Sequence, residues 1–457
     1  MPRGVWKAAV TAMGDNGATF FSGLRGMGGH LGRSWSLGWP MILIMAFEFL
    51  INLTDVYIAG LLDRRIQAAV GFSTQVYFIF IVIANALTVG TVSVCARLYA
   101  GGKREELSRT VSTVTLAVLA AGVVLGAGGV LLSPLVLPLL NVPREVMDRA
   151  LPLVRIYAAG LPFHYLLVNS NGILRATGGV RHSLVTMAAV CAANVGLNFL
   201  MVFHTPLGYH GIALSTVISV VAGAGINSRH VKKLVAASFA FSREILSGVA
   251  NIGWPAAVQQ ASWHVGSTVM FLILGALPGD TVSVMAAFTN GLRIEAAIFL
   301  PAFALNMANA VVVGNMLGAG RKRDAFRGGV ATALIGVGVI SVLTVITLVN
   351  ARSFSSMLSG DARVVEECAR YLLISMISEP FMAWGVILGG GLMGAGDTRS
   401  MMYVITGTFW TVRIPLAYVL GVAMGFGPPG VWWAMNASIA ANAALLSARY
   451  FRKRWIS

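Results

Sequence analysis

The chain has 457 residues, of which 57% are hydrophobic and only 11% are charged, and its mean hydropathy is +0.78. Soluble domains carry about 25% charged residues, so this composition excludes a soluble globular protein and indicates a polytopic membrane protein. The formal net charge of +16 comes from basic residues in short segments between apolar runs. This distribution excludes a separate nucleic-acid-binding domain and is typical of loops that face an anionic leaflet.

Residues 1–35 are Gly-rich and basic and lack both a continuous apolar run and a small-residue cleavage site. We therefore predict a cytoplasmic N-terminal tail over residues 1–35 and no signal peptide. The rest of the chain is dominated by apolar runs long enough to cross a bilayer as helices. We predict an all-α membrane protein with twelve transmembrane helices. Their expected ranges are 36–62, 68–98, 108–138, 152–175, 183–204, 210–230, 245–277, 283–316, 325–350, 365–394, 400–424 and 429–450.

The first of these runs carries two acidic residues, Glu48 and Asp55. A spacing of seven residues is two helical turns, so both lie on one face, ~10 Å apart along the axis. An acid at the bilayer centre costs ~3 kcal/mol even on the lower scale. This face is therefore expected to meet a polar interior, where Asp55 is the stronger candidate for function. The alternative is that one acid is the structural partner of a buried Arg or of a backbone group.

The basic residues of the loops predict the orientation. Of the 33 Lys and Arg residues, 23 fall on the side of the chain termini, Arg175 among them, and 8 on the other side. Arg293 and Arg413 lie within apolar runs and are expected to be intramembrane. The positive-inside rule then predicts that both termini are cytoplasmic.

The chain contains an internal repeat. Residues 98–105 resemble residues 317–324, residues 172–176 resemble 391–395, and both pairs share an offset of 219 residues. The same offset relates Gly208 and Gly211 to Gly427 and Gly430, and Gly-Trp-Pro occurs at both 38–40 and 253–255. We predict two six-helix halves, 36–230 and 245–450, joined by a cytoplasmic loop over 231–244 and followed by a cytoplasmic C-terminus over 451–457. Because six is even, the halves are parallel repeats related by a pseudo-twofold axis along the membrane normal.

Several motifs in this framework resemble those of a known family. They are Leu53-Thr54-Asp55, Arg293-Ile294-Glu295, the Leu-Gly-Ala-Gly-Arg-Lys loop at 317–322, Gly-Ala-Gly-Asp-Thr-Arg at 394–399 and Val-Arg-Ile-Pro-Leu at 412–416. Together with the repeat they resemble the multidrug and toxic-compound extrusion (MATE) family over residues 36–450. The resemblance implies a V-shaped secondary transporter that exports organic, often cationic or amphipathic compounds in exchange for H⁺ or Na⁺.

The resemblance also implies a cation site in the N-terminal half, at Asp55, Asn194, Asn198 and Thr216. Asn194 and Asn198 lie at i and i+4 and so face the same way. The family pattern has a second carboxylate where this chain has Asn198. One carboxylate with two amides and a hydroxyl can ligate Na⁺ through oxygen atoms, or bind a proton because burial favours the neutral acid. We favour the proton, with Glu48 as a further member of the coupling site. Interhelical hydrogen bonding is the structural alternative for the two Asn residues.

A second branch of the family uses acids in the C-terminal half, but here the seventh-helix acid is absent and Glu379 is displaced from the tenth-helix position. We therefore expect no cation site there, and interpret Glu295, Glu379 and Arg413 as a mainly structural set in which Arg413 pairs with one of the acids. His264 could titrate, although we favour an interior hydrogen-bonded role for it. The candidates for the substrate cavity are Phe47, Gln260, Trp263, His264, Met270 and Glu295.

No catalytic, nucleotide-binding or calcium-loop motif occurs, and the three Cys residues, far apart in sequence, are expected to be free. We therefore expect a non-enzymatic transporter with no cofactor beyond its coupling ion, no certain metal and no nucleic-acid partner. Its partners are expected to be small drug-like molecules and the lipid bilayer, and it is expected to be a monomer of a bacterial inner membrane. The alternative function is a flippase for lipids or lipid-linked precursors, which would need a strongly cationic cavity.

Overall fold

The computed structural model of the protein describes residues 28–140, 143–235 and 241–456. The described residues form helices and short connections, without a strand. Ten helical segments are long and apolar enough to cross a membrane. Two more, α8 (Arg243–Gly275) and α16 (Gly427–Phe451), lie beside them with comparable lengths of 33 and 25 residues. The prediction of an all-α membrane protein built from twelve long helical segments is therefore confirmed.

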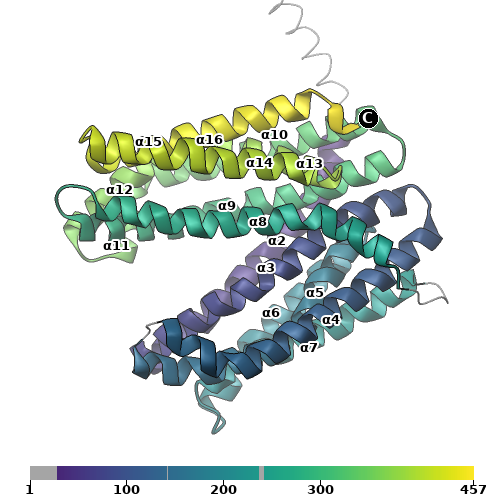
Figure 1. Cartoon of the computed structure of the whole chain (residues 1–457), viewed down its shortest axis with the longest axis horizontal. Helices are drawn as coiled ribbons and strands as arrows, with labels where there is room; N and C mark the ends of the chain where they lie inside the picture. Colours follow the sequence, from purple (N-terminus) through teal and green to yellow (C-terminus); the bar gives the residue numbers. More distant parts are fainter. Residues whose placement is uncertain (1–27, 141–142, 236–240, 457) are drawn as a thin grey trace, which may run out of the picture.

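The helices form two bundles (Figure 1). The N-terminal bundle contains α2 (Gly28–Leu62), α3 (Arg64–Ala100), α4 (Arg104–Val136), α5 (Arg144–Ala176), α6 (Val180–Phe203) and α7 (His210–Val231). The C-terminal bundle contains α8, α9 (Thr281–Gly318), α10 (Lys322–Val349), α11 (Ala351–Leu358), α12 (Ala362–Ser375), α13 (Glu379–Gly394), α14 (Thr398–Thr408), α15 (Ile414–Tyr418) and α16. A 3₁₀ turn joins α12 to α13 in one span, and π-helical turns extend the α14–α15 span to Ala423.

Two of the predicted boundaries differ from the structure. The predicted tail over 1–35 lies outside the described residues up to residue 27, and from Gly28 the chain is already helical. This early start has a packing reason, because the Ser34 hydroxyl accepts a hydrogen bond from Thr332 of the other bundle at 2.8 Å. Of the predicted loop over 231–244, residues 236–240 lie outside the described part, and α8 already begins at Arg243.

Glycines with positive φ end equivalent helices in the two bundles. Gly102 and Gly320 have φ values of 70° and 73°, and Gly178 and Gly396 have values of 82° and 85°. An L-residue with a side chain rarely adopts this left-handed conformation, so glycine is the residue that can close these helix ends. The members of each pair are 218 residues apart, one fewer than the 219 of the sequence repeat. At the first loop, for example, the glycine with positive φ is Gly102, whereas the sequence repeat aligns Gly101 with Gly320. The repeat is thus present in the backbone, with a register shifted by one residue at these two loops.

The two bundles converge at one end and diverge at the other, which gives the molecule a V shape (Figure 1). They converge at the end that carries the basic loops, which we call the basic end, and the C-terminus lies there too. Gly253 of α8 packs against the carbonyl oxygen of Ala86 in α3, and Gly38 of α2 packs against Leu305 in α9. Ala86 and Leu305 are 219 residues apart, so these two contacts between the bundles are pseudo-symmetric. The glycines of both Gly-Trp-Pro motifs therefore lie where the bundles touch.

The two bundles have different interiors. The C-terminal bundle has one continuous apolar core, in which Phe288, Tyr371 and Trp432 pack ring against ring. The buried apolar residues of the N-terminal bundle fall instead into several smaller clusters. These clusters are separated because polar side chains and a cavity occupy the middle of that bundle.

Candidate functional site

A buried carboxylate stands at the centre of the N-terminal bundle. Asp55 of α2 is 7% exposed, and its two oxygens accept hydrogen bonds from Asn198 Nδ2 at 2.7 Å and from Thr216 Oγ1 at 3.0 Å. Asn194 donates through Nδ2 to Thr216 Oγ1 at 3.0 Å, and its Oδ1 accepts from Asn198 at 3.2 Å. Four of the five residues predicted for the coupling site, all except Glu48, thus come together from α2, α6 and α7. Their role in coupling stays a prediction.

The amide oxygens of Asn194 and Asn198 already accept hydrogen bonds within the bundle. Asn198 Oδ1 accepts a hydrogen bond from Ser215 at 2.7 Å, and Asn194 Oδ1 accepts from Asn198. A Na⁺ site needs several oxygen atoms directed at one point, whereas here an amide N–H group and a hydroxyl face the carboxylate. Among the described residues no group of three or more His, Cys, Asp or Glu side chains could hold a metal ion. In this arrangement the Asp55 carboxylate faces hydrogen-bond donors, and the amide oxygens beside it already accept hydrogen bonds.

Thr216 allows the site to accept a proton without breaking its network. Its Oγ1 lies 3.0 Å from Asp55 Oδ2 and 3.2 Å from the carbonyl oxygen of Ile212. With ionised Asp55, the hydroxyl donates to the carboxylate. With protonated Asp55, the acid can donate to Oγ1 while the hydroxyl turns to Ile212, and Asn194 continues to donate to Oγ1 in both states. The same heavy-atom positions therefore serve both protonation states.

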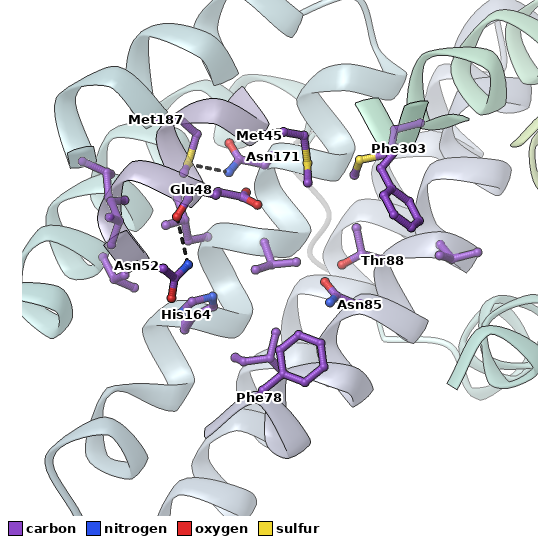
Figure 2. Close-up of a pocket in the computed structure, with 18 of the residues that line it drawn as sticks. Met45, Glu48, Asn52, Phe78, Asn85, Thr88, His164, Asn171, Met187 and Phe303 are labelled. Carbon is purple, nitrogen blue, oxygen red and sulfur yellow. Dashed lines mark hydrogen bonds between the residues drawn. The ribbon is translucent and has the colours of Figure 1, made fainter. Parts of the chain in front are cut away.

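Asp55 borders a cavity of about 440 Å³ between the two bundles. Most of its polar lining comes from the N-terminal bundle. The residues that line it from the C-terminal bundle are Gln260, Phe303, Met307, Ala310, Val311 and Met393. Methionines and aromatic rings adapt to ligands of different shapes. The labelled residues of Figure 2 are Met45, Glu48, Asn52, Phe78, Asn85, Thr88, His164, Asn171, Met187 and Phe303.

Glu48 and Arg175 bring opposite charges to this cavity. The Glu48 side chain faces the cavity beside Asn52 and Asn171 (Figure 2), as expected from its position two turns before Asp55. Arg175, counted from the sequence with the basic residues on the side of the chain termini, lies in the last turn of α5, is 5% exposed and lines the cavity. Asn171 precedes Arg175 by four residues and lies on the same helix face, which is the signal in the sequence that could have identified Arg175.

Three aromatic side chains line the cavity together with Asp55, and sequence reasoning missed them. Tyr77 Oη and His164 Nδ1 form a hydrogen bond at 2.6 Å, and the Tyr77 ring stacks on Tyr157 with centroids 4.9 Å apart. All three line the cavity together with Asp55 and Thr216. No motif in the sequence connects them, because they come from α3 and α5 and meet only through helix packing.

Several predicted cavity residues lie elsewhere. Gln260 lines the cavity, but Phe47 packs in an apolar cluster of the N-terminal bundle, and Met270 is 2% exposed in the core of the C-terminal bundle. Trp263 is exposed, and the His264 ring contacts Trp263 and, across the gap between the bundles, Phe78. These wrong predictions share one cause. The spacing of residues along a helix predicts which of them share a helix face, but it does not predict which neighbouring helix packs against that face.

Glu295 is also not a cavity residue. It is 4% exposed and lies inside the C-terminal bundle, in a buried set with Glu379 and Arg413. The Arg413 guanidinium lies over the Phe409 ring, 4.8 Å from its centroid. Among the described residues, no ion pair within 4.0 Å joins Arg413 to either acid, so the predicted salt bridge is not formed.

Known proteins match both the sequence and the fold. The MatE family model matches residues 40–200 and 255–419, one segment in each bundle. The chain is 25% identical over 428 residues to the "probable multidrug resistance protein NorM" of Thermotoga maritima, covering 89% of each chain. Its fold is similar to a MOP superfamily transporter from Pyrococcus furiosus, with a TM-score of 0.87, 20% identity and 93% and 96% of the two chains covered. The Vibrio cholerae MATE transporter VcmN in its bent form gives a TM-score of 0.87 at 19% identity, with 93% and 97% covered.

Proposed function

The chain belongs to the MatE family of membrane transporters, and from this premise we propose that it exports organic, often cationic or amphipathic compounds by antiport with H⁺. The observation that carries the proposal is the environment of Asp55. This buried carboxylate borders the cavity between the bundles, and its hydrogen-bond partners among the described side chains, Asn198 and Thr216, are neutral. A buried acid without a charged partner is a group that exchanges a proton when its surroundings change.

Coupling follows from the charge of this one group. A cationic compound in the cavity is held best while Asp55 is ionised, and a proton on Asp55 removes that attraction. Proton and compound therefore compete, and each shifts the population of states toward the one it binds better. The Thr216 hydroxyl supports this exchange, because it can donate either to Asp55 or to the Ile212 carbonyl.

The proposed orientation places the basic end of the molecule in the cytoplasm, together with both termini, by the positive-inside rule. The V then opens away from the cytoplasm, so the described state is the one that releases its compound outside. The bacterial NorM relative supports placement in a bacterial inner membrane. We propose that the protein acts as a monomer and needs no cofactor beyond its coupling ion.

Efflux of ethidium from proteoliposomes tests the coupling ion. We expect an imposed ΔpH to drive efflux and an imposed Na⁺ gradient at equal pH to have no effect. The reason is that the amide oxygens of Asn194 and Asn198 are already hydrogen-bonded and are not free to ligate Na⁺. Efflux driven by Na⁺ alone would contradict proton coupling while leaving antiport intact. No efflux under either gradient, for ethidium and for other cationic dyes, would contradict the exporter.

Asn198→Asp is expected to make the transporter respond to Na⁺. The substitution replaces the amide that donates to Asp55 at 2.7 Å by a second carboxylate. Two carboxylates at this distance do not both ionise without a cation between them, so they share a proton or bind Na⁺. Ethidium efflux at zero ΔpH should then increase with an imposed Na⁺ gradient. Asn350→Asp, which adds the same charge at an exposed position, should stay insensitive, and insensitivity of both variants would contradict the prediction.

The flippase alternative is less well supported. A flippase for anionic or pyrophosphate-linked lipids needs a strongly cationic cavity. The side chains that line this cavity include one guanidinium, from Arg175, against the carboxyl groups of Glu48 and Asp55. Arg293 is exposed on α9, and Arg413 lies within the C-terminal bundle, so neither adds positive charge to the cavity wall.

A further inference from the structure

Arg175 presents a buried and unpaired guanidinium to the cavity. Its Nη1 donates to the sulfur of Met307 across the gap between the bundles at 3.7 Å, and sulfur is a weak acceptor. Within the described part of the chain, no carboxylate lies within 4.0 Å of the guanidinium. An Arg held in this way costs free energy unless an anionic group reaches it. The proton-coupled exchange described above makes no use of Arg175.

The polar side chains around Arg175 do not supply that anion. Asn171, on the same face of α5, accepts hydrogen bonds at Oδ1 from Ser183 at 2.8 Å and from Asn227 at 2.7 Å. Its Nδ2 points to the sulfur of Met187 at 3.2 Å. The oxygen of Asn171 is thus already occupied within the bundle and leaves no free acceptor for the guanidinium.

Glu48 is the acidic counterpart across the same cavity. It interacts electrostatically with Arg175, but the two side chains come from α2 and α5 and form no contact within 4.0 Å. The Glu48 carboxylate has no hydrogen bond from a described side chain; the Asn52 amide donates to the Glu48 backbone oxygen instead, at 2.9 Å. Apart from Asp55, whose carboxylate is hydrogen-bonded to Asn198 and Thr216, the cavity therefore holds one positive and one negative group, each open to a ligand.

We propose that Glu48 and Arg175 form a subsite for organic zwitterions, in which Glu48 binds the ligand's cationic nitrogen and Arg175 binds its carboxylate. The inference rests on the proposed export function and specifies its substrate class. A guanidinium binds a carboxylate through two parallel hydrogen bonds. A simple cation would instead be repelled by Arg175 when it approached Glu48. The apolar body of the ligand would lie against apolar side chains that line the same cavity, among them Met45, Phe78 and Phe303.

A matched pair of dyes tests this subsite. Rhodamine 110 is a zwitterion, and rhodamine 123 is its methyl ester, a cation with the same ring system. We expect both to bind the purified protein in detergent, as followed by fluorescence anisotropy. In Arg175→Gln the ratio of the Kd of rhodamine 110 to that of rhodamine 123 should rise about tenfold or more, the value of one charge-assisted hydrogen-bonded contact.

Three further variants separate the subsite from general effects. Arg175→Lys keeps the charge but loses the two-bond geometry, so its ratio should be intermediate. Glu48→Gln removes the contact that both dyes share, so both Kd values should rise while their ratio stays close to wild type. Arg181→Gln removes an exposed Arg at the start of α6 and should leave the ratio unchanged.

The proposal is overturned if wild-type protein binds rhodamine 123 but not rhodamine 110, a result that needs no variant to fold. It is also overturned if Arg175→Gln and Arg181→Gln change the ratio equally. Displacement of rhodamine 110 by phosphatidylethanolamine would assign the subsite to a lipid headgroup and not to a soluble zwitterion. Failure of the export function itself is a different result, because ΔpH would then drive neither dye out of proteoliposomes.

Discussion

Asp55→Asn is expected to reduce ΔpH-driven ethidium efflux to the level of protein-free liposomes, while the protein remains folded in the membrane. Asn has the shape of protonated Asp but cannot release or bind the coupling proton. Its carbonyl oxygen can still accept from Asn198, and its N–H₂ group can donate to Thr216 Oγ1 once the hydroxyl turns to Ile212. The network of hydrogen bonds is therefore kept while the exchangeable charge is lost.

The stability of Asp55→Asn distinguishes this loss from misfolding. Because the variant removes a buried charge that has no ion-pair partner, its Tm in detergent should equal or exceed that of the wild type at neutral pH. Binding of a cationic dye should weaken and lose its dependence on pH, because pH no longer changes the charge at position 55. A variant that transports normally, or that loses transport only because its Tm collapses, would contradict the coupling role.

A matched substitution at the end of the same helix provides the control. Asp63 is exposed and caps the start of α3, where its side chain accepts a hydrogen bond from the Arg65 backbone N–H at 3.0 Å. Asn is as good a helix cap as Asp, so Asp63→Asn makes the same chemical change without touching the cavity. Efflux, dye binding and their pH dependence should all match the wild type.

Much of the fold could be predicted from the sequence because the membrane simplifies the problem. A bilayer-spanning segment must satisfy its backbone hydrogen bonds internally, so apolar runs translate directly into helices. The repeat then predicted two bundles, and the pairing of Gly38 and Gly253 in two Gly-Trp-Pro motifs marked positions that turn out to lie at the contact between the bundles. Asn194 and Asn198 were identifiable because residues at i and i+4 share a helix face.

The cavity could be predicted only in part, because it depends on how helix faces meet. Arg175 was counted with the basic residues of the cytoplasmic side because it ends a predicted span, yet it is buried in the last turn of α5 and lines the cavity. Met270 and Glu295 lie in apolar segments of the sequence. In these segments the spacing of polar residues does not distinguish the helix face at the cavity from the face at the core. The Tyr77–His164 hydrogen bond joins two residues that are 87 positions apart in the sequence, a contact that no local sequence pattern predicts.

Gly253→Ala is expected to weaken the contact between the two bundles at the basic end. An added Cβ at Gly253 would overlap the backbone carbonyl of Ala86 in α3, and backbone atoms cannot move aside as the end of a flexible side chain can. The two helices must therefore separate. Overpacking of this kind costs ~1–3 kcal/mol, which corresponds to a change of roughly 5- to 150-fold in the population of the state with a closed basic end.

The reciprocal contact of the same helix pair strengthens this expectation. Gly90 of α3 packs against the carbonyl oxygen of Val249 in α8, one turn before Gly253. Close backbone approach through glycine is how membrane helices associate without a hydrophobic driving force between them. Two such contacts on one helix pair act together, so a Cβ at Gly253 also weakens the contact at Gly90.

Distances between spin labels measure the shift directly. Labels at Lys103 and Lys322, which are exposed on the basic-end loops of the two bundles, should report a longer distance in Gly253→Ala, and efflux should slow because one state of the cycle is destabilised. Gly248→Ala lies five residues earlier on α8, where an added Cβ would meet no atom within 4 Å. Since Ala also favours the helix over Gly, the control should be at least as stable as the wild type, with an unchanged distance. Equal distances in both variants would mean that this glycine contact does not hold the basic end closed, and that closure depends on the pseudo-symmetric contact of Gly38 with Leu305.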